Sequence, residues 1–569
     1  MGSRPRNRLL EQLDAAKLRV GEIGPAQLNK LLQSLGRQIF PDAQSLARFH
    51  DGLVFLRAFP PNRTVLRRVE SLLTSFSQRI GHLLGQGIDL SILDEEELAG
   101  IAGTTLSGVW NYDEVAWLVD RFPKAVSIDW EGCDKPERLA AALPRFVPLL
   151  EEDAWVEADV PYRRWLQTAS RGPARELGWL IRQCERLSVS REERAEIFDS
   201  LELPFCWQLA NSRATRTLGK RPVRQIFYHR GPLVQRHDVS LANELAAPPL
   251  PLKKLSRREG RRIIDLCREA TTVRYRELYG TTRGDPAQVV QANVGRGVEI
   301  FLWGLPPERR LPLRAYQAGF TLKNGVPINY IEGIALFEWM EIGFNTFYAY
   351  RDGETAWVYS QVLRLLHQTL GATCISVYPY QLGKDNEEAI KSGAFWFYRK
   401  LGFRPMRAEL ARVVAAEEKK IAANPAYRTP PARLRRLAEG HVVYEMPGSQ
   451  IGAWDRFQMR NIGFAVQRRM AEQFDGDAAK IRLTSKTRVA QALAVNPEAW
   501  SSLERRAFEN YALVLALIPD LVRWMKDEKQ DLVRVIRAKA RSTESHYAHL
   551  LRDRTRLRSA MLRLGSARH

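Results

Sequence analysis

A short loop that enters a helix is the first place in this chain where binding chemistry is expected. Arg351-Asp352-Gly353-Glu354 follows a strand-like run, and a helix is predicted to begin at Thr355. The unpaired amides and partial positive charge of a helix N-terminus attract anions, so the loop predicts a phosphate cradle. Asp352 and Glu354 allow a second interpretation, a helix start stabilised by its own acidic side chains. Both interpretations stay open at this point.

An aromatic helix is the second place where chemistry is expected. Residues 394–403 run Ala-Phe-Trp-Phe-Tyr-Arg-Lys-Leu-Gly-Phe, a helix that ends in Gly and is followed by a strand. Tyr398 has an ordinary pKa of about 10, so its hydroxyl is protonated at neutral pH and can donate. The alternative is that the four aromatic side chains form the buried face of the helix.

The elements that must position these residues predict a mixed sheet. Two strand-like runs, 315–322 and 326–336, flank Lys323-Asn324-Gly325, and Asn-Gly between strands is a strong hairpin signal. The elements predicted after them, in order, cover 339–350, 355–370, 373–378, 386–401, 408–422 and 441–446. Strands and helices in this order predict an α+β, or mixed α/β, domain.

The same segment resembles the GNAT superfamily of acyl-CoA-dependent N-acyltransferases. That family commonly shows Asn-x-x-Ala-x-x-Phe-Tyr-x-Lys-x-Gly-Phe on its last main helix. The chain supplies Ala394, Phe397, Tyr398, Lys400, Gly402 and Phe403 in register, with Lys391 at the place of the Asn. The family's acyl-CoA loop is Gln/Arg-x-x-Gly-x-Gly/Ala. Arg351 and Ala356 match its ends and Glu354 replaces its central Gly; in the register that starts at Tyr350, Gly353 takes that place.

The resemblance implies a fold, a co-substrate and a set of site residues. The co-substrate would be acetyl-CoA or another acyl-CoA, and no metal is implied. An amine would attack the thioester, and Tyr398 would protonate the departing thiolate. The residues implied in cofactor binding are Arg351, Gly353, Glu354, Thr355 and Ala356. If Glu354 only replaces a loop glycine, the substitution Glu354→Gly is expected to keep or raise the affinity for the cofactor.

A general base is expected on the strands that would line an acceptor cleft. Glu332, Glu338 and Glu341 lie on these strands, where burial raises the pKa of a carboxyl group. Glu338 and Glu341 differ in parity, so at most one of them faces the cleft on a regular strand. Glu341 is the predicted catalytic carboxylate.

Charge and the pattern of predicted helices and strands divide the chain into three regions. Residues 1–235 are expected to form a helical domain of unknown role, in which 64–84 carries one amphipathic stripe. Residues 236–447 form the GNAT-like domain, and 448–569 form a basic region with long helices expected over 500–526 and 530–564. The net charge is +21, and 448–569 alone hold 23 basic and 13 acidic residues. This excess favours a polyanionic partner such as nucleic acid.

Composition excludes several classes of protein. Five scattered cysteines without a C-x-x-C pair argue against a disulfide framework or a structural zinc site. No stretch has the roughly 18 clean apolar residues that span a bilayer, and no apolar segment follows the basic N-terminus. Dinucleotide, Walker, zinc-protease and nucleophile-elbow motifs are absent from the sequence. A cytoplasmic protein is expected.

The function predicted from the sequence is an acyl-CoA-dependent N-acyltransferase that acts on an amine. Two alternatives stay open. In one, Asp352 and Glu354 mark a lost cofactor site and the fold serves only as a binding protein or scaffold. In the other, the chain is an aminoacyl-tRNA-dependent transferase or another nucleic-acid-associated protein, which would suit its positive charge.

Overall fold

The computed structural model describes residues 3–148 and 160–566. The contacts within the chain divide it into two units, each described by itself. The N-terminal unit comprises Met1–Pro222, Tyr228–Gly231 and Arg268–Leu278, and the sheet unit comprises Val223–Phe227, Pro232–Cys267 and Tyr279–His569. The predicted ranges 236–447 and 448–569 both fall in the sheet unit, apart from residues 268–278.

The N-terminal unit combines helices with a small sheet that the sequence did not predict. Its helices are α1 (Ser3–Leu18), α2 (Pro25–Gly36), α3 (Ala43–Ala58), α4 (Arg63–Thr74), α5 (Phe76–Gly85), α6 (Tyr112–Arg121), α7 (Pro136–Ala142), α9 (Tyr162–Ser170), α10 (Glu176–Arg186) and α11 (Arg191–Asp199). Its strands are β1 (Thr105–Gly108), β2 (Val126–Ile128) and β3 (Phe205–Gln208), in the order β1-β3-β2. Phe205 and Trp207 of the central strand, β3, are buried in a hydrophobic core of this unit.

The single amphipathic helix predicted over 64–84 is two helices, α4 and α5, which meet at Ser75. The backbone of Ser75 is not helical (φ −92°, ψ 9°), and its hydroxyl donates to the carbonyl of Leu72 at 3.2 Å. A serine side chain competes in this way for the carbonyls of a helix. The apolar stripe continues across the break, since Val69, Phe76 and Ile80 are all buried.

A buried histidine makes the stability of the N-terminal unit depend on pH. His50 is fully buried beside the hydroxyl of Thr217 (2.9 Å), and burial lowers its pKa from 6.5 to about 4. The unfolded chain therefore takes up a proton between pH 6.5 and about 4 while the folded unit does not. We expect the free energy of unfolding to fall by about 3 kcal/mol over this window, at about 1.36 kcal/mol per pKa unit.

Urea denaturation of the wild type and of His50→Gln at several pH values measures this effect. The glutamine keeps an amide near Thr217 but does not titrate, so the variant should lose less stability between pH 6.5 and 4. An identical pH dependence in the two proteins would show that His50 is not its source.

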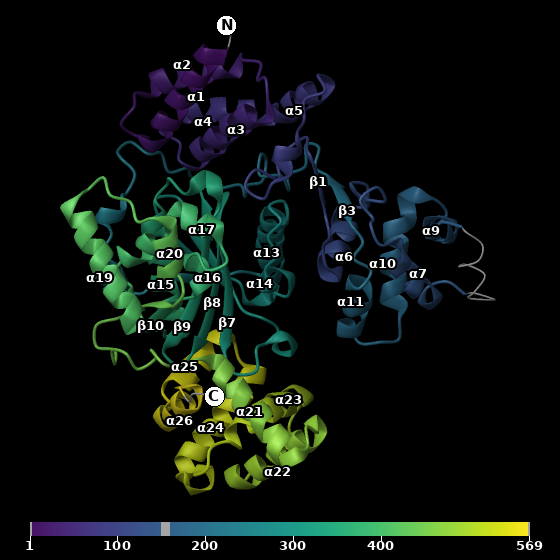
Figure 1. Ribbon diagram of the computed structural model, residues 1–569, viewed down its shortest axis with the longest axis vertical. Coiled ribbons are helices and arrows are strands. Elements are labelled where there is room, and N and C mark those ends of the chain that lie inside the picture. Colours follow the sequence, from purple (N-terminus) through teal and green to yellow (C-terminus); the bar gives the residue numbers. More distant parts are fainter. Residues whose placement is uncertain (1–2, 149–159, 567–569) are drawn as a thin grey trace. The chain divides into compact units, whose positions relative to one another are not determined.

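The sheet unit is built on nine strands in the order β11-β12-β10-β9-β8-β7-β6-β5-β4 (Figure 1). Their bounds are β4 (Leu252–Lys254), β5 (Val290–Gly295), β6 (Val298–Trp303), β7 (Ala315–Lys323), β8 (Val326–Leu336), β9 (Trp339–Thr346), β10 (Cys374–Val377), β11 (Arg404–Pro405) and β12 (Val442–Glu445). β9 and β10 pair in parallel, and the other neighbours are antiparallel. Mixed α/β architecture is thereby confirmed.

The predicted hairpin is confirmed at the turn between β7 and β8. Asn324 and Gly325 both have positive φ, +51° and +79°, as a two-residue turn between right-twisted strands requires. The helix predicted over 355–370 is α15 (Thr355–Leu370). The helix predicted over 386–401 is interrupted at Gly393 (φ +65°), which separates α17 (Glu387–Ser392) from α18 (Ala394–Arg399).

Helices cover both faces of the sheet. The helices that precede the strands of the sheet or connect them in the chain include α12 (Leu241–Ala246), α13 (Arg257–Thr272), α14 (Tyr279–Thr282), α16 (Pro379–Leu382), α19 (Ala408–Ala423) and α20 (Pro431–Leu437). α15 covers one face, where Leu366 lies against Gly333 and Thr369 donates to Gln317 at 2.8 Å. α14 lies on the other face, where Gly280 is packed against Tyr316 and Ala318.

The C-terminal helices gather at one end of the sheet (Figure 1). They are α21 (Met459–Phe474), α22 (Ala478–Leu493), α23 (Ser502–Leu515), α24 (Lys526–Arg541), α25 (Glu544–Arg552) and α26 (Thr555–Ser566). The long helices predicted over 500–526 and 530–564 are thus shorter segments. Pro519 cannot continue a helix, and Thr543 starts a new one by accepting from the amide of His546 at 3.2 Å.

Buried polar groups hold these helices on the sheet. Lys539 donates to the carbonyl of Arg314 and to Glu544, each at 2.8 Å, and is 3% exposed. Tyr547 donates to the carbonyl of Leu313. Glu338, in the turn between β8 and β9, accepts from Arg558 and from the indole of Trp454.

Candidate functional site

The end of β9 that extends beyond β10 is the centre of the candidate site. The two parallel strands pair from Trp339 with Cys374 to Ile342 with Val377, where β10 ends. β9 continues to Thr346, and this last part, Gly343–Thr346, pairs with β8 on its other side. A backbone edge that faces no strand can bind an extended ligand through its amides and carbonyls.

The N-terminus of α15 follows this edge in the chain. β9 leads through a short 3₁₀ turn, η7 (Tyr348–Tyr350), and the loop 351–354 into Thr355, the first residue of α15. No side chain among the described residues caps this N-terminus. Within the loop, the amide of Gly353 donates to Tyr350 and the hydroxyl of Thr355 donates to Arg351, while Ala356 is buried.

Arg351 is held at the edge of the loop. Its guanidinium lies 3.8 Å from the centre of the Tyr348 ring and donates to the carbonyl of Thr346 at 3.2 Å. It also forms an ion pair with Glu388 of α17. The side chain is about a third exposed, so it is both oriented and accessible.

Glu354 lies inside the molecule instead of facing the loop surface. Its side chain is fully buried, 3.0 Å from the ammonium of Lys323 and 2.9 Å from Nε of Arg296. Burial lowers the pKa of Lys323 to about 8, against the opposing effect of Glu354. The amide of Val234 also donates to Glu354 at 3.2 Å. Its negative charge is thus balanced within the protein and turned away from the loop.

Tyr398 belongs to an aromatic cluster that reaches the open part of β9. Its ring centre lies 5.7 Å from Tyr359 of α15 and 5.7 Å from Phe403, and burial raises its pKa. Tyr359 in turn lies 4.7 Å from Phe344, which is on the open segment of β9. The hydroxyl of Tyr359 is buried without a hydrogen-bond partner in the described part of the chain. Both interpretations of Tyr398, buried packing and a proton donor, are compatible with this position.

One face of β8 and β9 is only half covered. Along both strands buried residues alternate with half-buried ones, and the register places the half-buried ones on a common face. They are Tyr330, Glu332, Ile334, Glu341, Gly343 and Asn345. This half-covered face carries two carboxylates, Glu332 and Glu341.

The two carboxylates differ in their partners. Glu341 is paired with Arg314 at 2.8 Å. Glu332 accepts a hydrogen bond from Tyr316, and no ion pair joins it to any other residue that the structure describes. Burial raises the pKa of both. Gly343 lies opposite Glu332 in the register and leaves room beside it, with Gln381 across the gap.

Glu338, the remaining acidic residue considered from the sequence, is not on a strand. It lies in the turn at the far end of β9 and is bound by Arg558 and Trp454.

Sequence reasoning also missed Lys323 and Arg296 as partners of Glu354. A lysine next to an Asn-Gly turn was the available signal, but a lysine there is ordinarily exposed.

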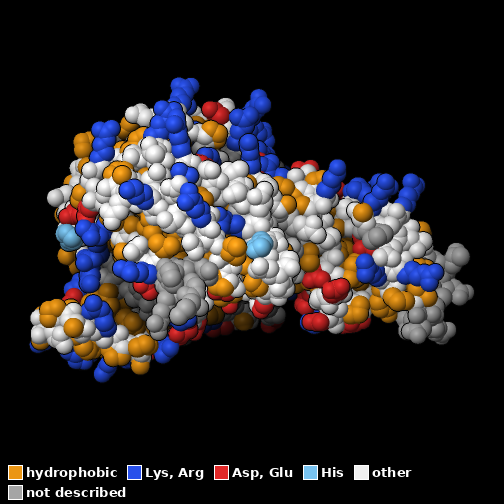
Figure 2. Space-filling view, turned by 90° about the horizontal axis from the view of Figure 1, so that it is seen from above, with side chains coloured by type: hydrophobic (Ala, Val, Ile, Leu, Met, Phe, Trp, Pro, Cys, Tyr) orange, Lys and Arg blue, Asp and Glu red, His pale blue; other side chains and the backbone are white. Residues whose placement is uncertain are grey.

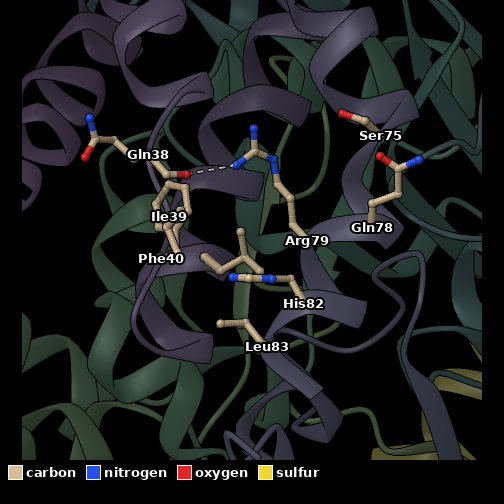
Figure 3. Close-up of a pocket in the computed structure, with 9 residues that line it drawn as sticks. Gln38, Ile39, Phe40, Ser75, Gln78, Arg79, His82 and Leu83 are labelled. Carbon is tan, nitrogen blue, oxygen red and sulfur yellow. Dashed lines mark hydrogen bonds between the residues drawn. The ribbon is translucent and has the colours of Figure 1, made fainter. Parts of the chain in front are cut away.

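A separate pocket of about 280 Å³ lies in the N-terminal unit between α3 and α5 (Figure 3). Its walls include Phe40, Leu46 and Leu83, and Arg79 projects into it. Arg79 donates to the carbonyls of Gly36 and Gln38, at the end of α2. This arginine therefore has a structural task, and we assign no ligand to the pocket.

Other site types find no support in the described residues. They contain no group of three or more His, Cys, Asp and Glu side chains arranged for a metal ion. Within the same residues, no helix has both the length and the apolar character needed to cross a bilayer. Lys and Arg side chains stand in several separate groups on the face shown in Figure 2. Comparisons with protein-family models, curated proteins and solved structures found no match to this chain.

Proposed function

We propose that the sheet unit is an acyl-CoA-dependent N-acyltransferase. The observation that carries this proposal is that β9 extends beyond the end of β10, unpaired on that side, and leads to a helix N-terminus that no described side chain caps. The open edge of β9 would pair with the amides of the pantetheine arm, and the amides that begin α15 would hold the pyrophosphate. The GNAT resemblance supports the same assignment. In that family, as in this chain, a hairpin and a strand precede the loop, and a helix and a strand follow it.

The acceptor would enter from the half-covered face of β8 and β9. An aliphatic amine arrives protonated, and Glu332 is a carboxylate that forms no ion pair with any residue the structure describes. We assign Glu332, in preference to Glu341, the removal of this proton, because Arg314 already holds Glu341. The amine nitrogen then attacks the thioester carbonyl, the carbon–sulfur bond breaks, and Tyr398 gives its proton to the departing thiolate. The nitrogen loses its second proton to water, and a proton from water restores the Tyr398 hydroxyl.

The inward position of Glu354 favours this proposal over a lost cofactor site. That alternative depended on two acidic side chains repelling a pyrophosphate. One of the two is balanced by Lys323 and Arg296 within the protein, so only Asp352, which is exposed, remains near the loop surface.

Titration of acetyl-CoA into the protein by calorimetry tests the proposal. We expect saturable binding, weakened roughly tenfold or more in Arg351→Ala through loss of a charge-assisted contact with phosphate. Glu388→Gln is the matched control, because it releases Arg351 from its ion pair without removing the guanidinium. Absence of binding in a folded wild-type sample, or equal weakening in both variants, would count against the assigned role of Arg351 and the loop.

A further inference from the structure

Three cations come together beside the proposed cofactor loop. Arg236 lies in η4 (Arg236–Asp238), Lys400 caps the C-terminus of α18, and Arg428 follows α19. Arg236 and Lys400 are more than 160 residues apart in the chain. None of the three forms an ion pair with a carboxylate of the described chain. We call these residues the rim cluster.

Backbone and side-chain contacts bring the rim cluster to the site. The amide of Val234, two residues before Arg236, donates to Glu354 at the start of α15, and η4 packs against α15. The indole of Trp396 donates to the hydroxyl of Thr429 at 3.1 Å, which fixes the segment containing Arg428 on α18. Lys400 follows Tyr398 on the same helix.

The charges of Arg236 and Arg428 both act on Lys400. Burial lowers the pKa of Lys400, and Arg236 and Arg428 lower it further. The guanidinium of Arg428 is oriented by the carbonyls of Pro425 and Tyr427, at 2.9 and 3.0 Å. Like charges held together in this way are stabilised by an anion with several acceptor oxygens.

Coenzyme A carries two separate phosphate groups. Its pyrophosphate lies between the pantetheine arm and the ribose, and a monoester phosphate is attached to the 3′ oxygen of the ribose. If the pyrophosphate lies at the N-terminus of α15, the 3′-phosphate lies within a ribose length of it, where nearby cations would stabilise it. A compact, doubly charged phosphate suits a cluster of three cations better than a neutral part of the ligand does.

We propose that Arg236, Lys400 and Arg428 bind the 3′-phosphate of coenzyme A, an inference that rests on the proposed function. The rim cluster selects coenzyme A over carriers that share its pantetheine arm but lack this phosphate. It contributes to binding of the cofactor and takes no part in proton transfer.

Calorimetric titration of acetyl-CoA and acetyl-dephospho-CoA into the full chain tests this inference. We expect the wild type to bind acetyl-CoA roughly tenfold or more tightly than the dephospho form. Each of three single variants, Arg236→Ala, Lys400→Ala and Arg428→Ala, should bind acetyl-CoA more weakly than the wild type does. Their affinity for acetyl-dephospho-CoA should stay within about twofold of the wild-type value, so the ratio of the two affinities falls. Arg412→Ala, an exposed residue of α19 without an ion pair, is the control for loss of one positive charge.

The outcomes separate this inference from the proposed function. Equal affinity of the wild type for both ligands would overturn the rim cluster assignment while leaving a CoA-binding protein. Equal loss of both ligands in the variants would overturn it as well, because the cluster would then contact another part of the cofactor. If neither ligand binds to the folded wild type, the proposed function fails and the inference fails with it.

Discussion

The Glu354→Gly protein is expected to be less stable than the wild type by about 3–5 kcal/mol, the usual result of breaking a buried ion pair. The substitution would leave the ammonium of Lys323 fully buried without its carboxylate. It would also remove the acceptor of the Val234 amide at the start of α15. Guanidinium denaturation followed by circular dichroism measures the difference directly.

A double variant separates loss of the pair from loss of a single charge. In Glu354→Met with Lys323→Met both buried charges are gone, and Arg296 is a third exposed and can reach water. Replacing both partners by apolar side chains is often close to neutral, so the double variant should recover much of the stability. A Glu354→Gly protein as stable as the wild type would contradict the buried pair. The structure thus predicts a loss of stability that the sequence-based expectation, which concerned only cofactor affinity, did not include.

Glu332→Gln is expected to lower kcat by roughly 10²- to 10⁴-fold, the range for loss of a general base. The amide is nearly isosteric and its oxygen can still accept from Tyr316, so the fold should be retained. Thiol release from acetyl-CoA in the presence of a panel of aliphatic primary amines measures the rate. Binding of acetyl-CoA by calorimetry should be unchanged.

The pH profile distinguishes a base from a structural carboxylate. Burial raises the pKa of Glu332, so the wild-type rate should fall as the pH drops through that raised value, and Glu332→Gln should lose this acid limb. Glu341→Gln is the control on the same half-covered face of β8 and β9, and it breaks the ion pair with Arg314. If Glu341→Gln abolishes the acid limb and Glu332→Gln does not, the two roles are exchanged.

Local signals predicted much of the sheet unit. The Asn-Gly turn required positive φ at both central residues, which few other pairs adopt, so the hairpin from β7 to β8 was readable from the sequence. α15 has the predicted bounds, since a buried apolar face runs through it and Gly371 ends it with φ +69°. Breaks at Ser75 and Gly393 were missed because an apolar stripe continues across each of them.

The charges of the candidate site were less predictable, because ion pairs join residues far apart in the chain. Glu354 has the appearance of a surface residue until Lys323 and Arg296 are placed beside it. Glu332 and Glu341 could not be ranked without knowing that Arg314 lies against only one of them. Local spacing identifies which residues share a strand, but not which charges are already balanced.

The anchoring of the C-terminal helices has a consequence for how the protein is made. The carbonyls of Leu313 and Arg314 are bound by Tyr547 and Lys539, and Glu338 by Arg558, partners at least 220 residues later in the chain. On the ribosome these polar groups must wait until the chain has been synthesised as far as residue 558. We therefore expect ribosome-bound chains that stop near residue 448 to keep this end of the sheet unfinished and accessible to chaperones.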